Sequence, residues 1–159
     1  MAGRAAVAGL VAALAAGGVT VATAESVTGG RLVAALTAVP GSSAVVRGAV
    51  VAYATDVKSS ALGVDPALLA EHGPVCASVA EQMARGVQGL LGATYGVATT
   101  GESGPAPASG SPVGIVFVSV AGTRGAVTRE MHLGGSREEI QSAAVVGALE
   151  LLAEVLADT

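Results

Sequence analysis

One residue in this chain is chemically conspicuous because its type is so rare in the sequence. Lys58 is the only lysine among 159 residues, and the other seven basic residues, apart from two histidines, are all arginines. A guanidinium stays protonated in proteins, whereas a desolvated lysine amine can lose its proton near neutral pH and act as a base. Lys58 is therefore either a catalytic base or an ordinary surface lysine, and composition alone leaves both open.

Ser26 is the candidate nucleophile for such a base. It lies in the segment Thr-Ala-Glu-Ser-Val-Thr-Gly-Gly of residues 23–30, between a predicted strand and helical sequence that begins at Arg31. A strand that turns directly into a helix presents free backbone NH groups and the positive end of the helix dipole, which favour anions and developing oxyanions. Ser26 and Thr28 also suit a simpler role as N-caps of that helix.

The elements that must position these two residues alternate between helices and strands. Apolar residues at helical spacing favour helices, and valine-rich or alternating runs favour strands. Glycine pairs and Gly-Pro steps mark where elements stop. In chain order we predict a helix over about 5–16, a buried strand from 19 to 23, a helix from 31, a strand over 44–54, helical sequence over 66–91 with a break at 73–74, and a short strand over 95–100.

The last third of the chain begins with a long loop. Residues 101–112 are rich in Gly, Pro and Ser and too numerous for a tight turn, so we expect a functional loop or a mobile lid. A β-hairpin of residues 113–121 and 127–133 follows. Ser136 and Glu139 then form a capping box for a final helix, whose predicted core face carries Ile140, Ala143, Ala144, Gly147, Leu151 and Val155.

This pattern predicts the fold class. Early alternation of helices and strands, followed by a strand pair, indicates a single α/β domain over residues 1–159, with three α/β/α layers and a mixed sheet of about five strands. Ligands collect in such sheets where strands end and loops diverge. Ser26, Lys58 and the loop after Thr100 each follow a predicted strand, so we expect them to meet at one edge of the sheet.

Composition argues against several classes of function. The formal net charge is −4, the basic residues are scattered and aromatic residues make up 2%, so no nucleic-acid partner is expected. A single cysteine, Cys76, excludes an intrachain disulfide. With only His72 and His132 beside it, no metal-ligand spacing appears, and we expect catalysis without a metal.

The stretch of residues 5–24 carries no charge, so it could be mistaken for a signal peptide or a membrane span. It is mostly Ala and Gly, and it is broken by a glycine pair, so we expect neither a membrane partner nor export but a cytoplasmic protein. The hydrophobic share is 52% although aromatic residues are few, which predicts a core of Ala, Val and Leu with close backbone approach.

Several short segments, each weak alone, together resemble the CinA C-terminal domain family in their order and spacing. The resemblance covers nearly the whole chain. The matching segments are 23–30, Val39-Pro-Gly-Ser-Ser43, Tyr53 with Lys58, Leu62-Gly-Val64, Thr100-Gly101 with Gly104-Pro105, Pro112-Val-Gly114 and Gly135-Ser-Arg137.

The resemblance implies a metal-free serine amidase that works with a Ser-Lys pair, here Ser26 and Lys58, and without a cofactor. The family includes nicotinamide-nucleotide amidohydrolases, which convert nicotinamide mononucleotide and water into nicotinate mononucleotide and ammonia. If the pair is catalytic, its hydroxyl and amine should lie within hydrogen-bonding reach.

Further site residues are expected around this pair. Tyr53 is assigned to hydrogen-bonding the substrate or tuning Lys58, with core packing as its ordinary alternative. Arg137, at the start of the last helix, suits a phosphate group, or is simply a solvated helix charge. Glu25 orients a pocket group or pairs with an arginine, or is a helix-entry carboxylate. The full set of predicted substrate-binding residues is Glu25, Val27, Thr28, Gly29, Gly30, Thr100, Gly101 and Arg137, with the backbone NH groups of 27–30 as oxyanion donors.

The sequence departs from the family pattern at several positions. Val27 replaces a frequent cysteine, and Gly101-Glu-Ser-Gly-Pro105 replaces Gly-Ile-Ala-Gly-Pro. Ser111 stands where a lysine is common, and Gln141 where a second basic residue is common. Losing two cations would weaken the binding of a phosphorylated substrate, since each charge-assisted contact contributes about 1.5 to 3 kcal/mol.

Two functions from different classes follow. The first is a Ser-Lys amidohydrolase that acts on nicotinamide mononucleotide in pyridine-nucleotide salvage, with a small-molecule nucleotide as its partner and a homo-oligomeric state. The second is a non-catalytic nucleotide-binding or competence-associated protein with the same fold. The retained Ser26 and Lys58 favour the enzyme, whereas the altered loop favours a binder or an amidase with a different substrate.

Overall fold

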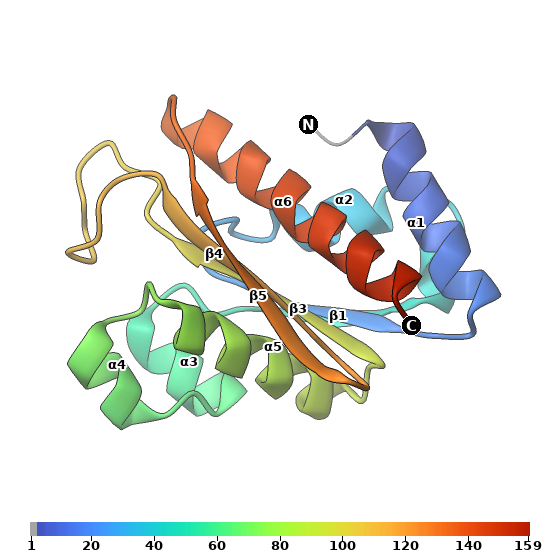
Figure 1. The fold of residues 1–159 in the computed structure, drawn as a ribbon, viewed down its shortest axis with the longest axis horizontal. Coiled ribbons are helices and arrows are strands. Elements are labelled where there is room, and N and C mark those ends of the chain that lie inside the picture. The colour runs from blue at the N-terminus through green and yellow to red at the C-terminus, as the bar shows by residue number, and fades with distance from the viewer. Residues whose placement is uncertain (1–2) are drawn as a thin grey trace.

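Five strands form one open, mixed sheet in a computed structural model that describes residues 3–159 (Figure 1). Their order across the sheet is β2-β1-β3-β4-β5. β2, β1 and β3 are parallel, and β4 and β5 join them as an antiparallel hairpin. The strands are β1 (Val21–Glu25), β2 (Val46–Val51), β3 (Tyr95–Gly101), β4 (Ile115–Gly122) and β5 (Gly125–His132).

Helices cover both faces of this sheet, so the predicted three-layer α/β/α fold is confirmed (Figure 1). One layer contains α1 (Arg4–Ala16), α2 (Arg31–Thr37) and α6 (Arg137–Ala157). The other contains α3 (Thr55–Leu62), α4 (Pro66–His72) and α5 (Ala77–Leu91), and a short 3₁₀ helix, η1 (Ser42–Ala44), precedes β2.

The core is built from small aliphatic side chains, as the composition predicts. One buried cluster lies between the sheet and α1, α2 and α6, and a second lies between the sheet and α3, α4 and α5. Two glycines make the second layer possible. A side chain on Gly96 of β3 would collide with the Ala84 carbonyl of α5, and one on Gly86 of α5 would collide with the Leu62 carbonyl at the end of α3. Close backbone approach thus replaces large side chains in this layer.

Local signals located most elements correctly but missed α3. The strand predicted over 44–54 is shorter, because Ser42–Ala44 forms η1 and β2 ends at Val51. The chain then enters α3, so Lys58 lies in a helix and not in a loop after a strand. The sequence of α3, Thr-Asp-Val-Lys-Ser-Ser-Ala-Leu, contains several weak helix formers, and packing against α5 stabilises it in spite of them.

The predicted capping box of Ser136 and Glu139 is present at the start of α6. Ser136 accepts a hydrogen bond from the Glu139 amide, and the Glu139 side chain accepts one from the Ser136 amide. Within residues 3–159, α6 alone has the length and apolar composition of a membrane-spanning helix. Half of its most apolar window is buried, and it packs on β4 and α2, as the core helix of a folded domain does.

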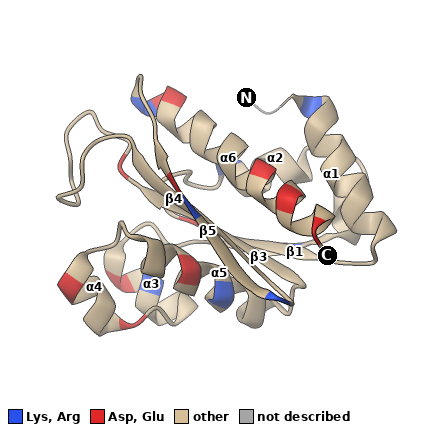
Figure 2. Ribbon diagram, in the orientation of Figure 1, with Lys and Arg blue, Asp and Glu red and all other residues tan. Residues whose placement is uncertain are grey.

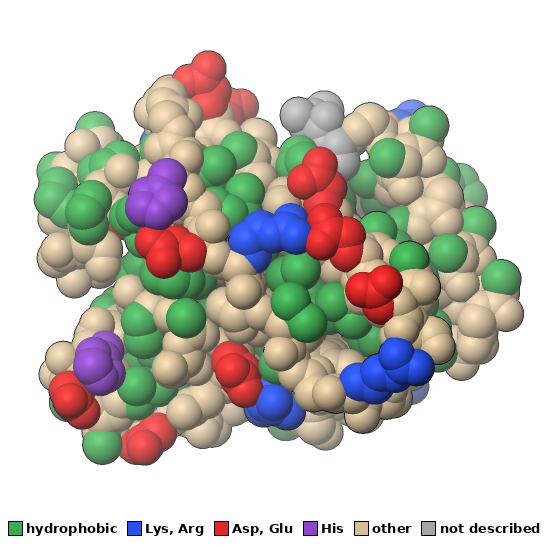
Figure 3. All heavy atoms as spheres, viewed as in Figure 1, with side chains coloured by type: hydrophobic (Ala, Val, Ile, Leu, Met, Phe, Trp, Pro, Cys, Tyr) green, Lys and Arg blue, Asp and Glu red, His purple; other side chains and the backbone are tan. Residues whose placement is uncertain are grey.

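Charged residues are distributed over both helical layers (Figure 2). On the face shown in Figure 3, basic side chains adjoin acidic ones. Arg129 of β5, for example, donates to the Glu154 carboxylate of α6 at 2.6 Å.

Candidate active site

The carboxyl ends of the three parallel strands bring distant segments together. In the sheet register Glu25 lies beside both Val51 of β2 and Thr99 of β3. The next residues of the three segments, beginning with Ser26, therefore converge at one edge, as predicted for an α/β sheet. They border a pocket of about 230 Å³, lined by Ser26, Val27, Tyr53, Thr55, Lys58, Pro74, Val75, Thr100, Gly101, Glu102, Ser103, Gly104, Ala106, Ala108, Ser109 and Arg137.

Ser26 and Lys58 are in direct contact in this pocket. The Lys58 Nζ lies 3.0 Å from the Ser26 Oγ, which confirms the predicted hydrogen-bonding reach. The same Nζ donates to the Ala52 carbonyl at 2.8 Å and lies 3.5 Å from the Tyr53 carbonyl. The Lys58 residue is only 1% exposed and Ser26 is 9% exposed, so the pair is shielded from bulk water.

The position of Lys58 follows from the geometry of α3. Side chains on a helix tilt toward its N-terminus. Lys58 lies in the first turn of α3, so its side chain extends back past the start of the helix to the carbonyls of Ala52 and Tyr53, which follow β2. The missed helix is thus the element that aims the amine at Ser26.

The protonation state of Lys58 makes the pair chemically useful. Burial lowers the pKa of Lys58 from 10.5 to about 8. Within residues 3–159 no carboxylate lies within 4 Å of its Nζ, so no ion pair opposes the loss of the proton. The amine donates to the Ser26 hydroxyl oxygen and to the Ala52 carbonyl and lies near the Tyr53 carbonyl. Once it has lost a proton, it keeps two hydrogens for the two carbonyls and gains a lone pair that can accept the Ser26 proton.

The turn after Ser26 leaves one backbone amide, that of Val27, for a ligand in the pocket. The Gly29 amide donates to the Ser26 carbonyl, and the Gly30 amide donates to Glu25. Among the described residues 3–159, the amides of Val27 and Thr28 have no hydrogen-bond acceptor. Of the predicted oxyanion donors, 29 and 30 are therefore excluded, because both glycine amides are used to close the turn.

Glu25 corrects the prediction for this segment. Its buried carboxylate accepts hydrogen bonds from the amides of Gly30, Leu32 and Val33 and from the hydroxyls of Thr23 and Thr28. Those amides belong to the N-terminus of α2, so Glu25 caps that helix and the predicted serine or threonine N-cap is wrong. Of the predicted substrate-binding residues, Glu25, Thr28, Gly29 and Gly30 do not line the pocket. The Glu25 carboxylate, the Thr28 hydroxyl and the two glycine amides bond within the turn or to its neighbours, and Thr28 is fully buried.

Tyr53 and Arg137 form the opposite rim of the pocket. Arg137 is the first residue of α6, and its guanidinium donates to the Gly104 carbonyl at 2.7 Å and to the Tyr53 hydroxyl at 2.8 Å. Tyr53 is 59% exposed, so it is not a core residue. The Tyr53 side chain holds Arg137, and only its backbone carbonyl approaches Lys58.

Thr100 and Gly101 end β3 and line the pocket as predicted. The Thr100 hydroxyl donates to the Pro74 carbonyl at 2.7 Å, which ties β3 to the connection between α4 and α5. Gly101 has no room for a side chain, since a Cβ would approach the Val116 side chain to 2.7 Å. Both residues shape the wall of the pocket through the backbone.

Glu102 is the site residue that sequence reasoning missed. Its Oε2 accepts hydrogen bonds from the Ala108 amide at 3.0 Å, the Ser109 amide at 2.9 Å and the Ser109 hydroxyl at 2.7 Å. Burial raises the pKa of Glu102, but these bonds and the Gly104 amide outweigh that effect and hold the pKa below its usual value. The segment of residues 101–112, predicted as a functional loop or a mobile lid, folds around this carboxylate. Its one sequence signal was an acidic residue in an otherwise uncharged Gly, Pro and Ser segment.

Ser111 and Gln141, which stand where basic residues are common in the family, lie outside the pocket. Gln141 is buried, and its side-chain amide donates to the Val27 carbonyl at 3.2 Å, so it supports the turn that carries Ser26. Ser111 lies farther along the loop. Neither residue lines the pocket, so an effect of these positions on phosphate binding would be indirect.

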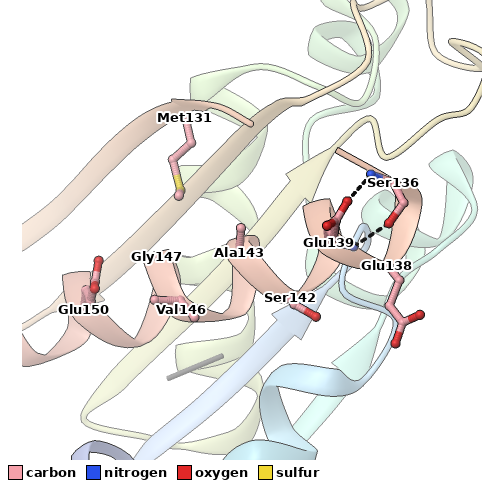
Figure 4. A pocket seen from close by; sticks show the side chains of 9 residues that line it. All are labelled: Met131, Ser136, Glu138, Glu139, Ser142, Ala143, Val146, Gly147 and Glu150. Atoms are coloured by element: carbon pink, nitrogen blue, oxygen red, sulfur yellow. Dashed lines mark hydrogen bonds between the residues drawn. The ribbon is translucent and has the colours of Figure 1, made fainter. Parts of the chain in front are cut away.

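A larger hollow of about 700 Å³ lies between α6 and Met131 of β5 (Figure 4). The acidic side chains at its edge are Glu138, Glu139 and Glu150, and Glu139 is occupied by the capping box with Ser136. It has no paired nucleophile and base. Among residues 3–159 no group of three His, Cys, Asp or Glu side chains is placed to hold a metal ion. The chemistry of a candidate active site therefore belongs to the Ser26 pocket.

Comparison with known proteins agrees with the family resemblance of the sequence and with the fold. Residues 4–156 match the family described as the CinA C-terminal domain. A CinA-like protein from Frankia casuarinae is 54% identical over 138 residues, which are 87% of this chain and 32% of that protein. The chain thus spans about a third of the length of the relatives it matches.

Solved structures show the same fold. A competence/damage inducible protein from Agrobacterium tumefaciens is 38% identical and superimposes with a TM-score of 0.92, over 97% of this chain and 94% of that one. A CinA superfamily protein from Klebsiella pneumoniae is 32% identical, with a TM-score of 0.94 and 98% of both chains covered.

Proposed function

This chain belongs to the CinA C-terminal domain family, and from that membership and its pocket we propose that it is a metal-independent Ser-Lys amidohydrolase. Its proposed substrate is nicotinamide mononucleotide, its products are nicotinate mononucleotide and ammonia, and its place is cytoplasmic salvage of pyridine nucleotides. The observation that carries the proposal is the 3.0 Å contact between the Ser26 hydroxyl and a buried Lys58 amine whose pKa is lowered to about 8.

The first half of the reaction forms an acyl-enzyme. Neutral Lys58 takes the Ser26 proton while Oγ attacks the carboxamide carbon. The carbonyl oxygen becomes an oxyanion, for which the amide of Val27, a residue that lines the pocket, is the available donor. The Lys58 ammonium then gives its extra proton to the carboxamide nitrogen, the C–N bond breaks, and ammonia leaves with the acyl group esterified to Ser26.

The second half repeats these steps with water. Lys58 takes a proton from a water molecule whose oxygen attacks the ester carbon, and the same oxyanion donor stabilises the second tetrahedral intermediate. When the C–O bond to Ser26 breaks, Lys58 returns a proton to Oγ. The acid product ionises, and the free pair is restored.

The activity should depend on pH through Lys58. The reactive form is the neutral amine, so it is lost as pH falls below the pKa of about 8. We expect kcat/KM to rise about tenfold per pH unit up to roughly pH 8 and then to level off. Initial rates between pH 6 and 9.5 measure this profile. A flat profile across that range, in a protein that stays folded, would contradict a base with this pKa.

Arg137 is expected to bind the substrate phosphate, because both its guanidinium charge and the positive end of the α6 dipole favour an anion. Arg137→Ala should raise KM by about tenfold or more, as expected for a lost charge-assisted contact, and lower kcat much less. Tyr53→Phe is the matched control, since it removes only the hydroxyl that Arg137 holds. A large loss of kcat with unchanged KM in Arg137→Ala would contradict the assignment.

Ammonia release from nicotinamide mononucleotide by the purified protein tests the proposed function directly. Turnover should persist after exhaustive treatment with a chelator. If a divalent ion were needed to restore it, the Ser-Lys mechanism would be wrong. Binding of the nucleotide without ammonia release would favour the non-catalytic alternative, and release of ammonia only from another carboxamide would favour an amidase with a different substrate.

A further inference from the structure

The mechanism above makes no use of Glu102, although its charge lies in the wall of the same pocket. The residue is 7% exposed and lines the pocket together with Ser26 and Lys58. Its Oε2 takes the three hydrogen bonds from Ala108 and Ser109. The Gly104 amide is a further donor to this carboxylate, and together these bonds hold the pKa of Glu102 below its usual value.

Among the described residues, the negative charge of Glu102 has no positive partner. Within residues 3–159 no lysine, arginine or histidine nitrogen lies within 4 Å of this carboxylate. The nearby Arg137 guanidinium donates instead to the Gly104 carbonyl and the Tyr53 hydroxyl. The two basic side chains that line the pocket, Lys58 and Arg137, contact other groups. A buried carboxylate held ionised by amide donors, with no cation beside it, therefore favours a positive charge in the part of the pocket next to Glu102.

We propose that Glu102 is a specificity-determining residue that selects carboxamides carried on a positively charged ring, such as an N-substituted pyridinium. This inference rests on the proposed amidase function and defines its substrate class. A pyridinium ring would gain an electrostatic partner that a neutral aromatic amide lacks. After hydrolysis the product bears a new carboxylate, which Glu102 repels, so the same residue weakens the binding of the product.

Glu102 also holds the loop, and a purely structural role predicts a different result. Loss of loop order would weaken the binding of charged and neutral amides alike. Selection by charge changes the ratio of the two affinities. The ratio therefore separates the two roles, whatever the absolute affinities are.

The test measures the affinity of the full chain for 1-methylnicotinamide, which is a cation, and for nicotinamide, which is neutral at pH 8. Calorimetry or NMR titration at low salt provides both dissociation constants. We expect the unmodified protein to prefer the cation by about tenfold, and Glu102→Gln, which keeps the shape and one acceptor oxygen, to lose that preference. Equal affinities in the unmodified protein, or an unchanged ratio in Glu102→Gln, would overturn the proposal.

Ser109→Ala is the matched control. It removes one hydrogen bond to Glu102 but leaves the charge, so the preference for the cation should persist even if both affinities fall. A loss of preference in Ser109→Ala equal to that in Glu102→Gln would assign the effect to loop order and would overturn the proposal. The unmodified protein alone already tests the preference if Glu102→Gln does not fold.

The ammonia assay keeps this inference separate from the proposed function. A preference for the cation without hydrolysis of nicotinamide mononucleotide would leave Glu102 as a selector in a binding protein and would reject the amidase. Hydrolysis of nicotinamide mononucleotide without any preference for the cationic probe would retain the amidase and reject the role of Glu102.

Discussion

Lys58→Arg should lose turnover almost as completely as Lys58→Ala, by several orders of magnitude, as expected when one member of a nucleophile and base unit is removed. Arginine keeps the positive charge but cannot serve as a base at neutral pH. It also cannot take the place of an amine whose buried Nζ lies between two carbonyls and the Ser26 hydroxyl. The measurement is the single-turnover or steady-state rate of ammonia release, with circular dichroism to confirm the fold.

Ser26→Ala should reduce the rate of ammonia release to the same low value as Lys58→Ala. The double variant should lose little more activity, because the two residues act as one unit. Ser60→Ala is the matched control, since Ser60 is exposed on the same helix as Lys58 and its removal should leave turnover unchanged. Robust activity in Lys58→Arg would show that the position needs only a positive charge, and Lys58 would then no longer be assigned as the base.

Glu25→Ala should cause the largest loss of stability among single substitutions near the site. The substitution leaves three amides at the N-terminus of α2 and two threonine hydroxyls without their shared acceptor. Each unsatisfied buried group costs about 1 to 3 kcal/mol, so we expect the free energy of unfolding to fall by about 4 kcal/mol after partial rescue by water. Such a loss is a large part of the total stability of an ordinary domain, about 5 to 15 kcal/mol.

Glu25→Gln should lie between Glu25→Ala and the unmodified protein, because one oxygen still accepts while the new NH₂ group faces donors. Urea unfolding measures all three free energies. Glu71→Ala is the matched control, since the Glu71 side chain is 75% exposed on α4 and its loss should change stability by no more than about 0.5 kcal/mol. Equal stability of Glu25→Ala and the unmodified protein would show that Glu25 does not cap α2.

The sequence by itself was sufficient for the architecture and for the central pair. Helical and strand periodicities, glycine stops and the Ser136 cap are local signals, and they located nearly every element of the α/β/α fold. Ser26 and Lys58 each follow a parallel strand, and the carboxyl ends of parallel strands share one edge of the sheet. Their proximity could therefore be predicted from order along the chain.

Only the tertiary structure decided what surrounds that pair. Lys58 reaches Ser26 from a helix that its own weak propensity does not reveal, because α3 depends on packing against α5. Glu25 was predicted to bind substrate, and Gln141 stands where a basic residue is common in the family, yet both side chains bond to backbone groups of the turn and of α2. Glu102 orders a loop through residues that follow it by six and seven positions. Which polar group meets which partner depends on contacts between segments that no local pattern records, and those contacts determine which residues are free to meet a substrate.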